Sequence, residues 1–296
     1  LLRARLLAAN RAKTTGDKLK ALTSGFKFNE FKPEFPGVAE PRTGKSMGES
    51  CEDMAKQWQI RREDQDLLAY ESHQKAAAAY ARGFYSDLVM PLRGLDKDNI
   101  LRPDTTLEKL ATLKPAFDKR SGNGTLTAGN STNLSDGASA ALLSSEAWAQ
   151  ANGKEIQAYL VDAQVAAVDF VAGEGLLMAP AWAVAQLLKR NNLKLQDFDF
   201  YEIHEAFAAQ VLCTLKAWES EEFCKTKLGM DGALGSIDRS KLNVVGSSLA
   251  LGHPFAATGA RVLATAAAQL EQRGSGRALI SVCTAGGMGV AAILER

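Results

Sequence analysis

The hydrophobic and polar positions of this chain predict helices in its first part and alternating strands and helices in its last part. Between residues 62 and 82 the apolar positions recur at helical spacing and Gly83 follows, which predicts one long helix with a glycine stop. Thr105 and Glu108 have the spacing of a capping box, so a second helix is expected to begin there and to end at Pro115.

The amino-acid composition of the chain changes after residue 122. Small and polar residues fill positions 127–137, and an alanine-rich segment follows as far as Gln150. Small side chains allow close approach of neighbouring elements, so this segment is predicted to be a helix that is buried on all sides.

From residue 156 onward, apolar runs of strand length alternate with runs of helical spacing. The expected strands cover residues 156–168, 198–203, 277–283 and 289–294, and the expected helices cover 179–191, 206–218 and 257–272. This alternation predicts an α/β sheet covered by helices. Only a short glycine turn separates the last two strands, so they are expected to pair as a hairpin with Cys283 at its tip.

Composition narrows the class of protein. A chain of 296 residues with 46% hydrophobic residues can bury a large core, as one large or two ordinary domains. Its net charge of +1 offers no overall field to attract nucleic acid or an anionic membrane. Asp169 and Glu174 interrupt the longest apolar region, so no membrane span is expected.

The chain opens on Leu1–Leu7, a basic and apolar stretch that is expected to form an amphipathic surface helix. Residues 32–37 are rich in proline and glycine and are expected to be a connector. The four cysteines, at positions 51, 213, 224 and 283, have no C-x-x-C spacing, which argues against a zinc site and a disulfide framework. A reducing compartment is therefore expected.

Three short motifs carry the candidate chemistry. They are His204-Glu205-Ala206-Phe207, Gly252-His253-Pro254 and the Cys283–Gly289 segment with its glycine turn. Glycine beside a histidine or a thiol lets a ligand approach the backbone closely, and two histidines with a cysteine can supply a base, a proton donor and an oxyanion site. His73 lies in a helical stretch without such neighbours and is expected to be structural.

These motifs resemble those of thiolases, in particular the branch with the trifunctional-enzyme β-subunit and its bacterial fatty-acid-oxidation counterpart. The resemblance implies the α/β thiolase-like five-layered α-β-α-β-α fold. Residues 1–122 would then form a mostly helical loop domain, 123–153 the last piece of the N-terminal half, and 154–296 the complete C-terminal half. It also implies cleavage of a 3-ketoacyl-CoA with coenzyme A to acyl-CoA and acetyl-CoA in β-oxidation.

The resemblance assigns roles to the motif residues. It implies that Cys283 is the general acid/base and that His253 activates a thiol and binds the thioester oxygen. His204 stands where many thiolases have asparagine and would stabilise an oxyanion directly or through water. Backbone N–H groups of Ala285 and Gly286 would add donors. Glycine is the commoner family residue at position 285, so alanine there requires a negative φ.

Coenzyme A contacts are implied in the same way. The resemblance places a pantetheine-contacting hydroxyl at Thr132 and an arginine for the phosphate or adenine side at Arg102. Met47 and Phe207 would line the acyl end. Taken as isolated residues, Arg102 fits an ordinary surface arginine equally well, and a methionine and a phenylalanine more often belong to a core.

A thiolase also carries a second, acyl-bearing cysteine in its N-terminal half. Cys51 lies among three carboxylates, which disfavour a thiolate. Cys213 and Cys224 flank an apolar helix and are expected to be structural. The nucleophile, with the front of the N-terminal half, is therefore expected upstream of Leu1.

Two alternatives stay open from the residues alone. One is a thiolase-like acyl-CoA-binding or scaffold protein without activity, and the other is a Cys-His hydrolase that uses Cys283 with His253. The thiolase reading implies coenzyme A as a co-substrate, no metal and no permanently bound cofactor. It further implies a homodimer or tetramer, association with a hydratase/dehydrogenase α-subunit, and a cytoplasmic location, with the mitochondrial matrix as the alternative.

Overall fold

The computed structural model describes residues 2–24 and 37–296, and the chain divides into a unit of residues 1–38 and a larger unit of residues 39–296. The first unit holds α1 (Leu2–Arg11) and α2 (Thr15–Thr23), which contact each other. The helix expected at the start of the chain is thus confirmed from Leu2 onward. All of the predicted connector except Gly37 lies outside the described residues.

Two helices open the larger unit. α3 (Met47–Gln57) begins with a capping box in which Ser46 and Glu49 satisfy each other's backbone N–H groups. α4 (Arg62–Ala81) confirms the long helix expected from the apolar spacing. Gly83 follows it with a φ of +78°, a conformation that favours glycine, so the predicted stop is confirmed as well.

The next helix starts one residue later than the sequence predicts. α5 (Leu107–Ala111) is capped by Thr106, whose hydroxyl accepts a hydrogen bond from the Lys109 backbone N–H. The predicted box of Thr105 and Glu108 is therefore wrong, because it is Thr106 that has the extended backbone of a cap, with φ −137° and ψ 161°. The helix ends ahead of the predicted proline stop.

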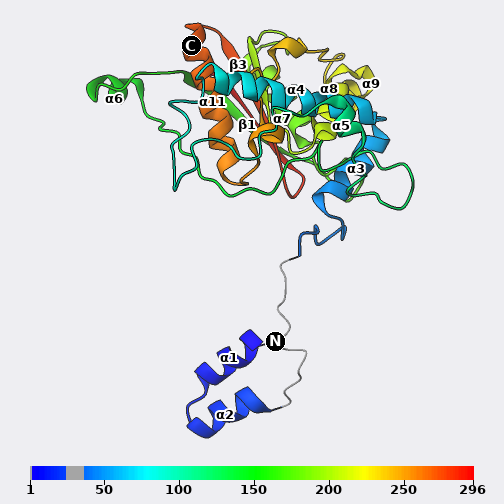
Figure 1. Ribbon diagram of the computed structural model, residues 1–296, viewed down its shortest axis with the longest axis vertical. Helices are drawn as coiled ribbons and strands as arrows, with labels where there is room; N and C mark the ends of the chain where they lie inside the picture. The colour runs from blue at the N-terminus through cyan, green and yellow to red at the C-terminus, as the bar shows by residue number, and fades with distance from the viewer. Residues whose placement is uncertain (1, 25–36) are drawn as a thin grey trace. The chain divides into compact units, whose positions relative to one another are not determined.

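The buried helix predicted before residue 150 is not formed. Only α6 (Glu146–Ala151) is helical there, and Leu142 and Leu143 are 74% and 61% exposed. A short helix needs a packed face for stability, and the described chain offers this segment none. Instead Ser139 donates to the Ala257 carbonyl, which ties the irregular backbone to another element. Figure 1 shows α6 at the periphery of the larger unit, away from the sheet.

A four-stranded mixed sheet, with strand order β1-β4-β3-β2, forms the centre of the larger unit. β3 and β4 form the predicted antiparallel hairpin, β1 pairs antiparallel with β4, and β2 runs parallel to β3. The bounds are β1 (Tyr159–Ala167), β2 (Phe200–Ile203), β3 (Arg277–Thr284) and β4 (Met288–Glu295). The expected strands are thus confirmed, with a later start for β1 and β2.

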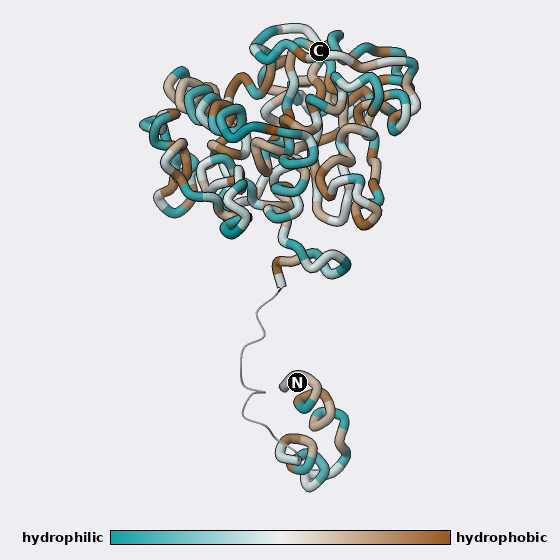
Figure 2. Tube along the Cα trace, turned by 90° about the vertical axis from the view of Figure 1, so that its right-hand side faces the viewer, coloured by the Kyte–Doolittle hydropathy of each residue, from teal (hydrophilic) through white to brown (hydrophobic). Residues whose placement is uncertain are grey.

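Helices cover both faces of the sheet. Successive residues of a strand point to opposite faces: Leu279 packs in one core with α7 (Ala179–Asn191) and α8 (Ala208–Glu219), whereas Ile280 packs with α11 (Ala257–Arg273). All three helices were predicted from the apolar spacing. Figure 1 shows the strands at the centre of the unit with helices around them, and Figure 2 shows hydrophobic and hydrophilic stretches alternating along its chain.

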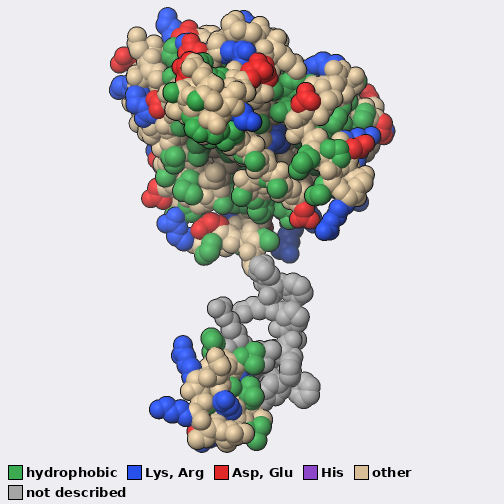
Figure 3. Space-filling view, turned by 90° about the vertical axis from the view of Figure 1, so that its left-hand side faces the viewer, with side chains coloured by type: hydrophobic (Ala, Val, Ile, Leu, Met, Phe, Trp, Pro, Cys, Tyr) green, Lys and Arg blue, Asp and Glu red, His purple; other side chains and the backbone are tan. Residues whose placement is uncertain are grey.

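Three short elements complete the described unit. They are α9 (Glu221–Thr226), the 3-10 helix η2 (Arg239–Lys241) and α10 (Ser248–Leu251). Among residues 2–24 and 37–296 no helix is long and apolar enough to cross a membrane. Figure 3 shows that exposed hydrophobic side chains gather on one face of the larger unit, with charged side chains mainly around them.

Candidate active site

His204 lies at the point where β2 ends, next to β3. Its backbone N–H donates to the Ser281 carbonyl at 2.8 Å, which continues the parallel pairing of β2 and β3. The side chain is completely buried, and its Nδ1 lies 2.6 Å from the Ser248 hydroxyl. The other ring nitrogen, Nε2, is buried and has no hydrogen-bond partner among the described residues.

His253 follows α10 in a glycine turn. Gly252 has a φ of +92°, and a Cβ there would lie 2.6 Å from the Ser135 hydroxyl, so glycine is required on both counts. The half-buried His253 ring has its Nδ1 2.7 Å from Thr258 Oγ1. Its centroid lies 4.2 Å from that of His204, with the ring planes tilted by 48°. Two predicted catalytic histidines, 49 positions apart in the numbering, are thus in contact.

Both imidazoles are neutral at physiological pH. Burial lowers the pKa of His204 well below its ordinary value, and the neighbouring His253 and Arg261 lower it further. Burial, reinforced by the positive charge of Arg261, lowers the pKa of His253 to about 4. A neutral imidazole can accept a proton on one nitrogen and donate from the other. The pair therefore offers both a base and a hydrogen-bond donor.

Cys283 lies on β3 and pairs with Gly289 across the hairpin. Its thiol is buried, and burial raises its pKa to about 12, so it is protonated at neutral pH. This state suits a proton donor. Cys283 comes two residues after Ser281, the strand partner of the His204 backbone. Within residues 37–296 no hydrogen bond joins Cys283 to either histidine.

The hairpin turn beyond Cys283 exposes backbone groups. Gly286 and Gly287 have φ values of +78° and +73°, while Ala285 is absent from the non-glycine residues with positive φ. The negative φ that alanine requires at position 285 is therefore present. Ala285 and Gly286 are exposed, so their backbone N–H groups are accessible to a ligand.

The predicted coenzyme A contacts lie in different surroundings. The Thr132 hydroxyl and backbone N–H both donate to the Ala206 carbonyl, at 3.1 and 3.0 Å, which holds Thr132 against the His204 motif. The exposed Arg102 guanidinium donates to the nearby carbonyls of Asn99 and Leu101. No described contact connects Arg102 to the histidine pair.

The two predicted acyl-end residues belong to one apolar cluster. Phe207 is the N-cap residue of α8 and packs edge-on against Phe117, with centroids 5.8 Å apart. Met47 begins α3 and packs against the same core, which also contains Cys283. Met47 and Phe207 therefore share an apolar cluster with Cys283.

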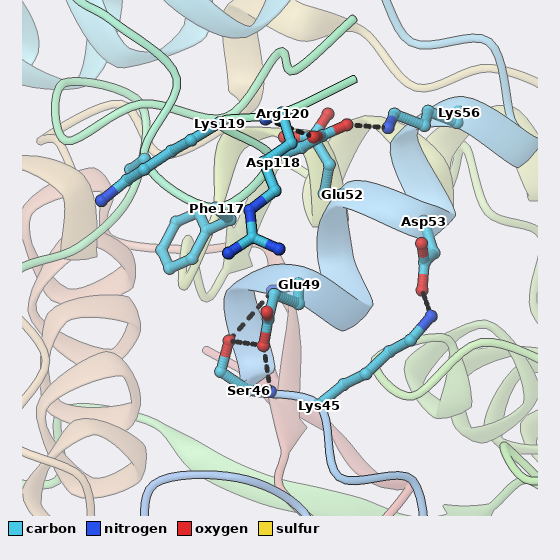
Figure 4. A pocket seen from close by; sticks show the side chains of 11 residues that line it. Lys45, Ser46, Glu49, Glu52, Asp53, Lys56, Phe117, Asp118, Lys119 and Arg120 are labelled. Carbon is cyan, nitrogen blue, oxygen red and sulfur yellow. Dashed lines mark hydrogen bonds and ion pairs between the residues drawn. The ribbon is translucent and has the colours of Figure 1, made fainter. Parts of the chain in front are cut away.

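A cavity of about 640 Å³ lies between α3 and residues 116–120, and no histidine lines it. Figure 4 shows two ion pairs in its lining, Lys45 with Asp53 and Lys56 with Asp118. Lys119 and Arg120 also line it. The cavity contains none of the predicted catalytic residues.

Comparison with known families decides the assignment. Residues 11–147 match the family model "Thiolase, N-terminal domain", and residues 154–296 match "Thiolase, C-terminal domain". The chain belongs to the thiolase family. The predicted fold class is thereby confirmed, and the sheet with its helices on both faces is part of the thiolase fold.

Curated thiolases match almost the whole chain. A 3-ketoacyl-CoA thiolase of Vibrio cholerae serotype O1 is 45% identical over 99% of this chain, which spans 68% of that protein. One of Pectobacterium carotovorum is 44% identical over 98% of the chain and 67% of its own length. The chain is thus shorter than the curated thiolases that it matches.

Solved thiolase structures agree. The acetyl-CoA acetyltransferase of Bacillus anthracis superposes with a TM-score of 0.73 at 34% identity, over 91% of this chain and 67% of its own. Human mitochondrial 3-ketoacyl-CoA thiolase gives a TM-score of 0.71 at 30% identity, over 87% of this chain and 61% of its own.

The other cysteines of this thiolase are buried. Burial, followed by the neighbouring thiols of Cys213 and Cys283, raises the pKa of Cys51 well above its ordinary value, and Glu52 contributes less. The predicted rise in the pKa of Cys51 is therefore confirmed, but its main cause is burial and not the carboxylates. Burial also raises the pKa of Cys213, and Cys224 donates to backbone carbonyls in the core. Neither Cys51 nor Cys213 is therefore poised to form a thiolate.

Sequence reasoning missed three side chains around the histidines. Thr258 contacts His253 directly, and Arg261 lies close enough for its charge to lower the pKa of both rings. Both residues lie in the first turns of the helix that follows His253, so their nearness in the sequence was a usable signal. Ser248 carries no such signal, because its contact with His204 exists only after β2 and α10 pack together. His73 is structural as predicted: it is buried, and its Nδ1 accepts from the Arg102 backbone N–H.

Proposed function

We propose that this protein is a 3-ketoacyl-CoA thiolase, an acyltransferase that cleaves a 3-ketoacyl-CoA with coenzyme A to acyl-CoA and acetyl-CoA. The observation that carries the proposal is the neutral pair of His204 and His253, in contact beside the strand that bears a protonated Cys283. The curated relatives at 44–45% identity carry this same activity in their names.

The chemistry of the proposal follows from these protonation states. A thiol nucleophile gives its proton to the neutral His253 as its sulfur bonds to the ketone carbon of the substrate. The His204 Nε2 nitrogen and the backbone N–H groups at Ala285 and Gly286 stabilise the oxyanion that forms. The bond between C2 and C3 then breaks, and Cys283 gives its proton to C2 of the departing acetyl-CoA.

The acyl group stays on the nucleophile as a thioester. The thiol of a second coenzyme A then gives its proton to the Cys283 thiolate and attacks the acyl carbon. The bond to the nucleophile breaks, and its sulfur takes back the proton held by His253, which restores both groups. We do not assign the acyl-carrying role to Cys51, Cys213 or Cys224, because all three are buried. The substrate contacts in this proposal are Thr132 for the pantetheine arm, Arg102 for the phosphate or adenine side, and Met47 with Phe207 for the acyl end.

The physiological setting belongs to the same proposal. Cleavage of 3-ketoacyl-CoA is a β-oxidation step, and acyl-CoA and coenzyme A are the small-molecule partners. We place the enzyme in the cytoplasm, with the mitochondrial matrix as the alternative, as a homodimer or tetramer able to associate with a hydratase/dehydrogenase α-subunit. Size-exclusion chromatography with light scattering, alone and with such a subunit, tests the assembly.

The activity is tested by incubating the full-length protein with a 3-ketoacyl-CoA and coenzyme A and identifying the products by mass spectrometry. We expect acetyl-CoA and an acyl-CoA shortened by two carbons. Cys283→Ala and His253→Ala should each lower kcat by about 10²- to 10⁴-fold, since each removes a proton-transfer group. Cys224→Ala, which removes a buried thiol outside the site, should leave kcat unchanged.

Other outcomes would contradict the proposal. Wild-type turnover by Cys283→Ala would remove its role as the proton donor. Binding of acyl-CoA without any cleavage by the wild-type protein would favour a non-catalytic scaffold. Hydrolysis to a free acid, with acylation of Cys283 itself, would favour a Cys-His hydrolase.

A further inference from the structure

A buried hydroxyl connects His204 to an arginine that the proposed mechanism does not use. Ser248, the first residue of α10, has its Oγ 2.6 Å from His204 Nδ1 and 2.6 Å from Arg261 Nη2. Ser248 and His204 are both completely buried. The three side chains form a continuous hydrogen-bonded row from α11 to the end of β2.

The direction of each hydrogen bond in this row follows from its chemistry. A guanidinium group can only donate, so Arg261 donates and Ser248 Oγ accepts. The single hydroxyl proton of Ser248 then needs its own acceptor. Among the described residues His204 Nδ1 is the acceptor within reach, so the serine donates to it. A ring nitrogen that accepts must carry a lone pair and no proton.

The proton of the His204 ring is therefore on Nε2. The ring is neutral, because burial and the nearby His253 and Arg261 lower its pKa well below the ordinary value, and a neutral imidazole carries one proton. Nε2 is the buried nitrogen without a partner in the described part of the chain. It is thus an open N–H donor in a ring that contacts His253.

The charge of Arg261 also acts on two carboxyl groups near this row. It lowers the pKa of the buried Glu202 and of the half-buried Asp98 against the effect of burial. Its Nε and Nη1 atoms make no hydrogen bond to a described residue. Its one direct side-chain hydrogen bond to a described residue is the bond to Ser248.

We propose that Ser248, oriented by Arg261, is a positioning residue that fixes His204 as the Nε2–H tautomer and aims this N–H at the oxyanion. The inference deepens the proposed thiolase function and rests on it only for the identity of the oxyanion. Without the hydroxyl, the neutral His204 ring can carry its proton on either nitrogen. An Nε2 atom without a proton would repel an oxyanion.

The tautomer can be read directly by NMR, because the chain contains only three histidines. In long-range ¹H–¹⁵N spectra of the wild-type protein with labelled histidine, His204 is expected to carry its proton on Nε2. Ser248→Ala should produce the Nδ1–H form, and Ser248→Thr should keep the wild-type form. Ser247→Ala is the matched control, since its buried hydroxyl faces the Ile203 carbonyl instead.

Kinetics supply the second readout. Ser248→Ala should lower kcat about 10- to 100-fold, the usual loss when a partner that orients a functional histidine is removed. Its KM should change less than about twofold, because the oxyanion exists only in the transition state. Ser248→Thr should recover most of kcat, and Ser247→Ala should match wild type.

An Nδ1–H ring in the wild-type protein, or an unchanged tautomer in Ser248→Ala, would overturn the inference whether or not the protein is active. A wild-type protein with the Nε2–H ring and no cleavage of 3-ketoacyl-CoA would instead refute the proposed function and leave the role of Ser248 in fixing the tautomer supported.

Discussion

His204 and His253 show how burial prepares a side chain for chemistry. Removal from water disfavours the charged form of an imidazole, and the nearby Arg261 disfavours it further in both rings. The structural His73 has the same property for the same reason: burial and then the charge of Arg102 lower its pKa to about 4. A depressed pKa alone therefore does not mark a catalytic histidine. His204 differs from His73 in its unpartnered buried ring nitrogen and its neighbouring imidazole.

These pKa values predict that no histidine in this protein titrates near neutral pH. A lowered pKa means that the neutral ring persists as the pH falls through 6.5, the ordinary midpoint, and takes up a proton only toward pH 4. The ring-proton NMR signals of all three histidines should stay constant between about pH 8 and pH 6. A titration midpoint near 6.5 for His204 or His253 would contradict the account.

At the scale of elements, the β3–β4 hairpin is positioned by close contact with α7. Gly289, the strand partner of Cys283, lies so near the start of α7 that a Cβ would be 2.5 Å from the Pro180 nitrogen and 2.7 Å from the Ala179 carbonyl carbon. Both of these atoms belong to the backbone and cannot rotate away. The glycine therefore sets the spacing between the helix and the strand next to Cys283.

Gly289→Ala should consequently destabilise the protein by about 1–3 kcal/mol, the usual cost of overpacking a core. Gly259→Ala is the matched control, because a Cβ there meets no atom within 4 Å and the residue lies in the first turn of α11. Alanine should leave the stability unchanged or raise it by up to about 1 kcal/mol. Denaturant unfolding measures both, and equal effects would refute the packing argument.

Elements with a strong local pattern could be predicted from the sequence. α4, α7 and α11 follow from apolar spacing, and the β3–β4 hairpin follows from two short strands and a glycine turn. The helix predicted before residue 150 failed because its apolar side chains had to find a tertiary partner, which no local pattern can report. The cap of α5 was misplaced by one residue, since two adjacent threonines offer the same side-chain chemistry.

The candidate site, too, could be predicted from the sequence only in part. His204, His253 and Cys283 could be named from their short motifs, and the structure brings the two histidines into contact. Ser248 could not be found, because it faces His204 only through the packing of α10 against the end of β2. Met47 and Phe207 share the apolar cluster of Cys283, whereas the coenzyme A role of Arg102 stays a prediction.

At the scale of the molecule, distant segments meet around the histidine pair. Thr132 bonds to the Ala206 carbonyl, and Leu134 forms a backbone bridge to His253. Glu205, next to His204, accepts a hydrogen bond from Ser72 in α4. Segments around residues 130, 205 and 253 are thus bound to one another. Our central claim is that they act together on one thioester.

A double-mutant cycle on kcat/KM for 3-ketoacyl-CoA cleavage tests that claim most directly. His204→Ala and His253→Ala should each lower kcat/KM by about 10²-fold or more. Because the two rings contact each other and serve one reacting group, the double variant should lose little more than the worse single variant. Single variants within about twofold of wild type, or losses that simply multiply in the double variant, would contradict the account.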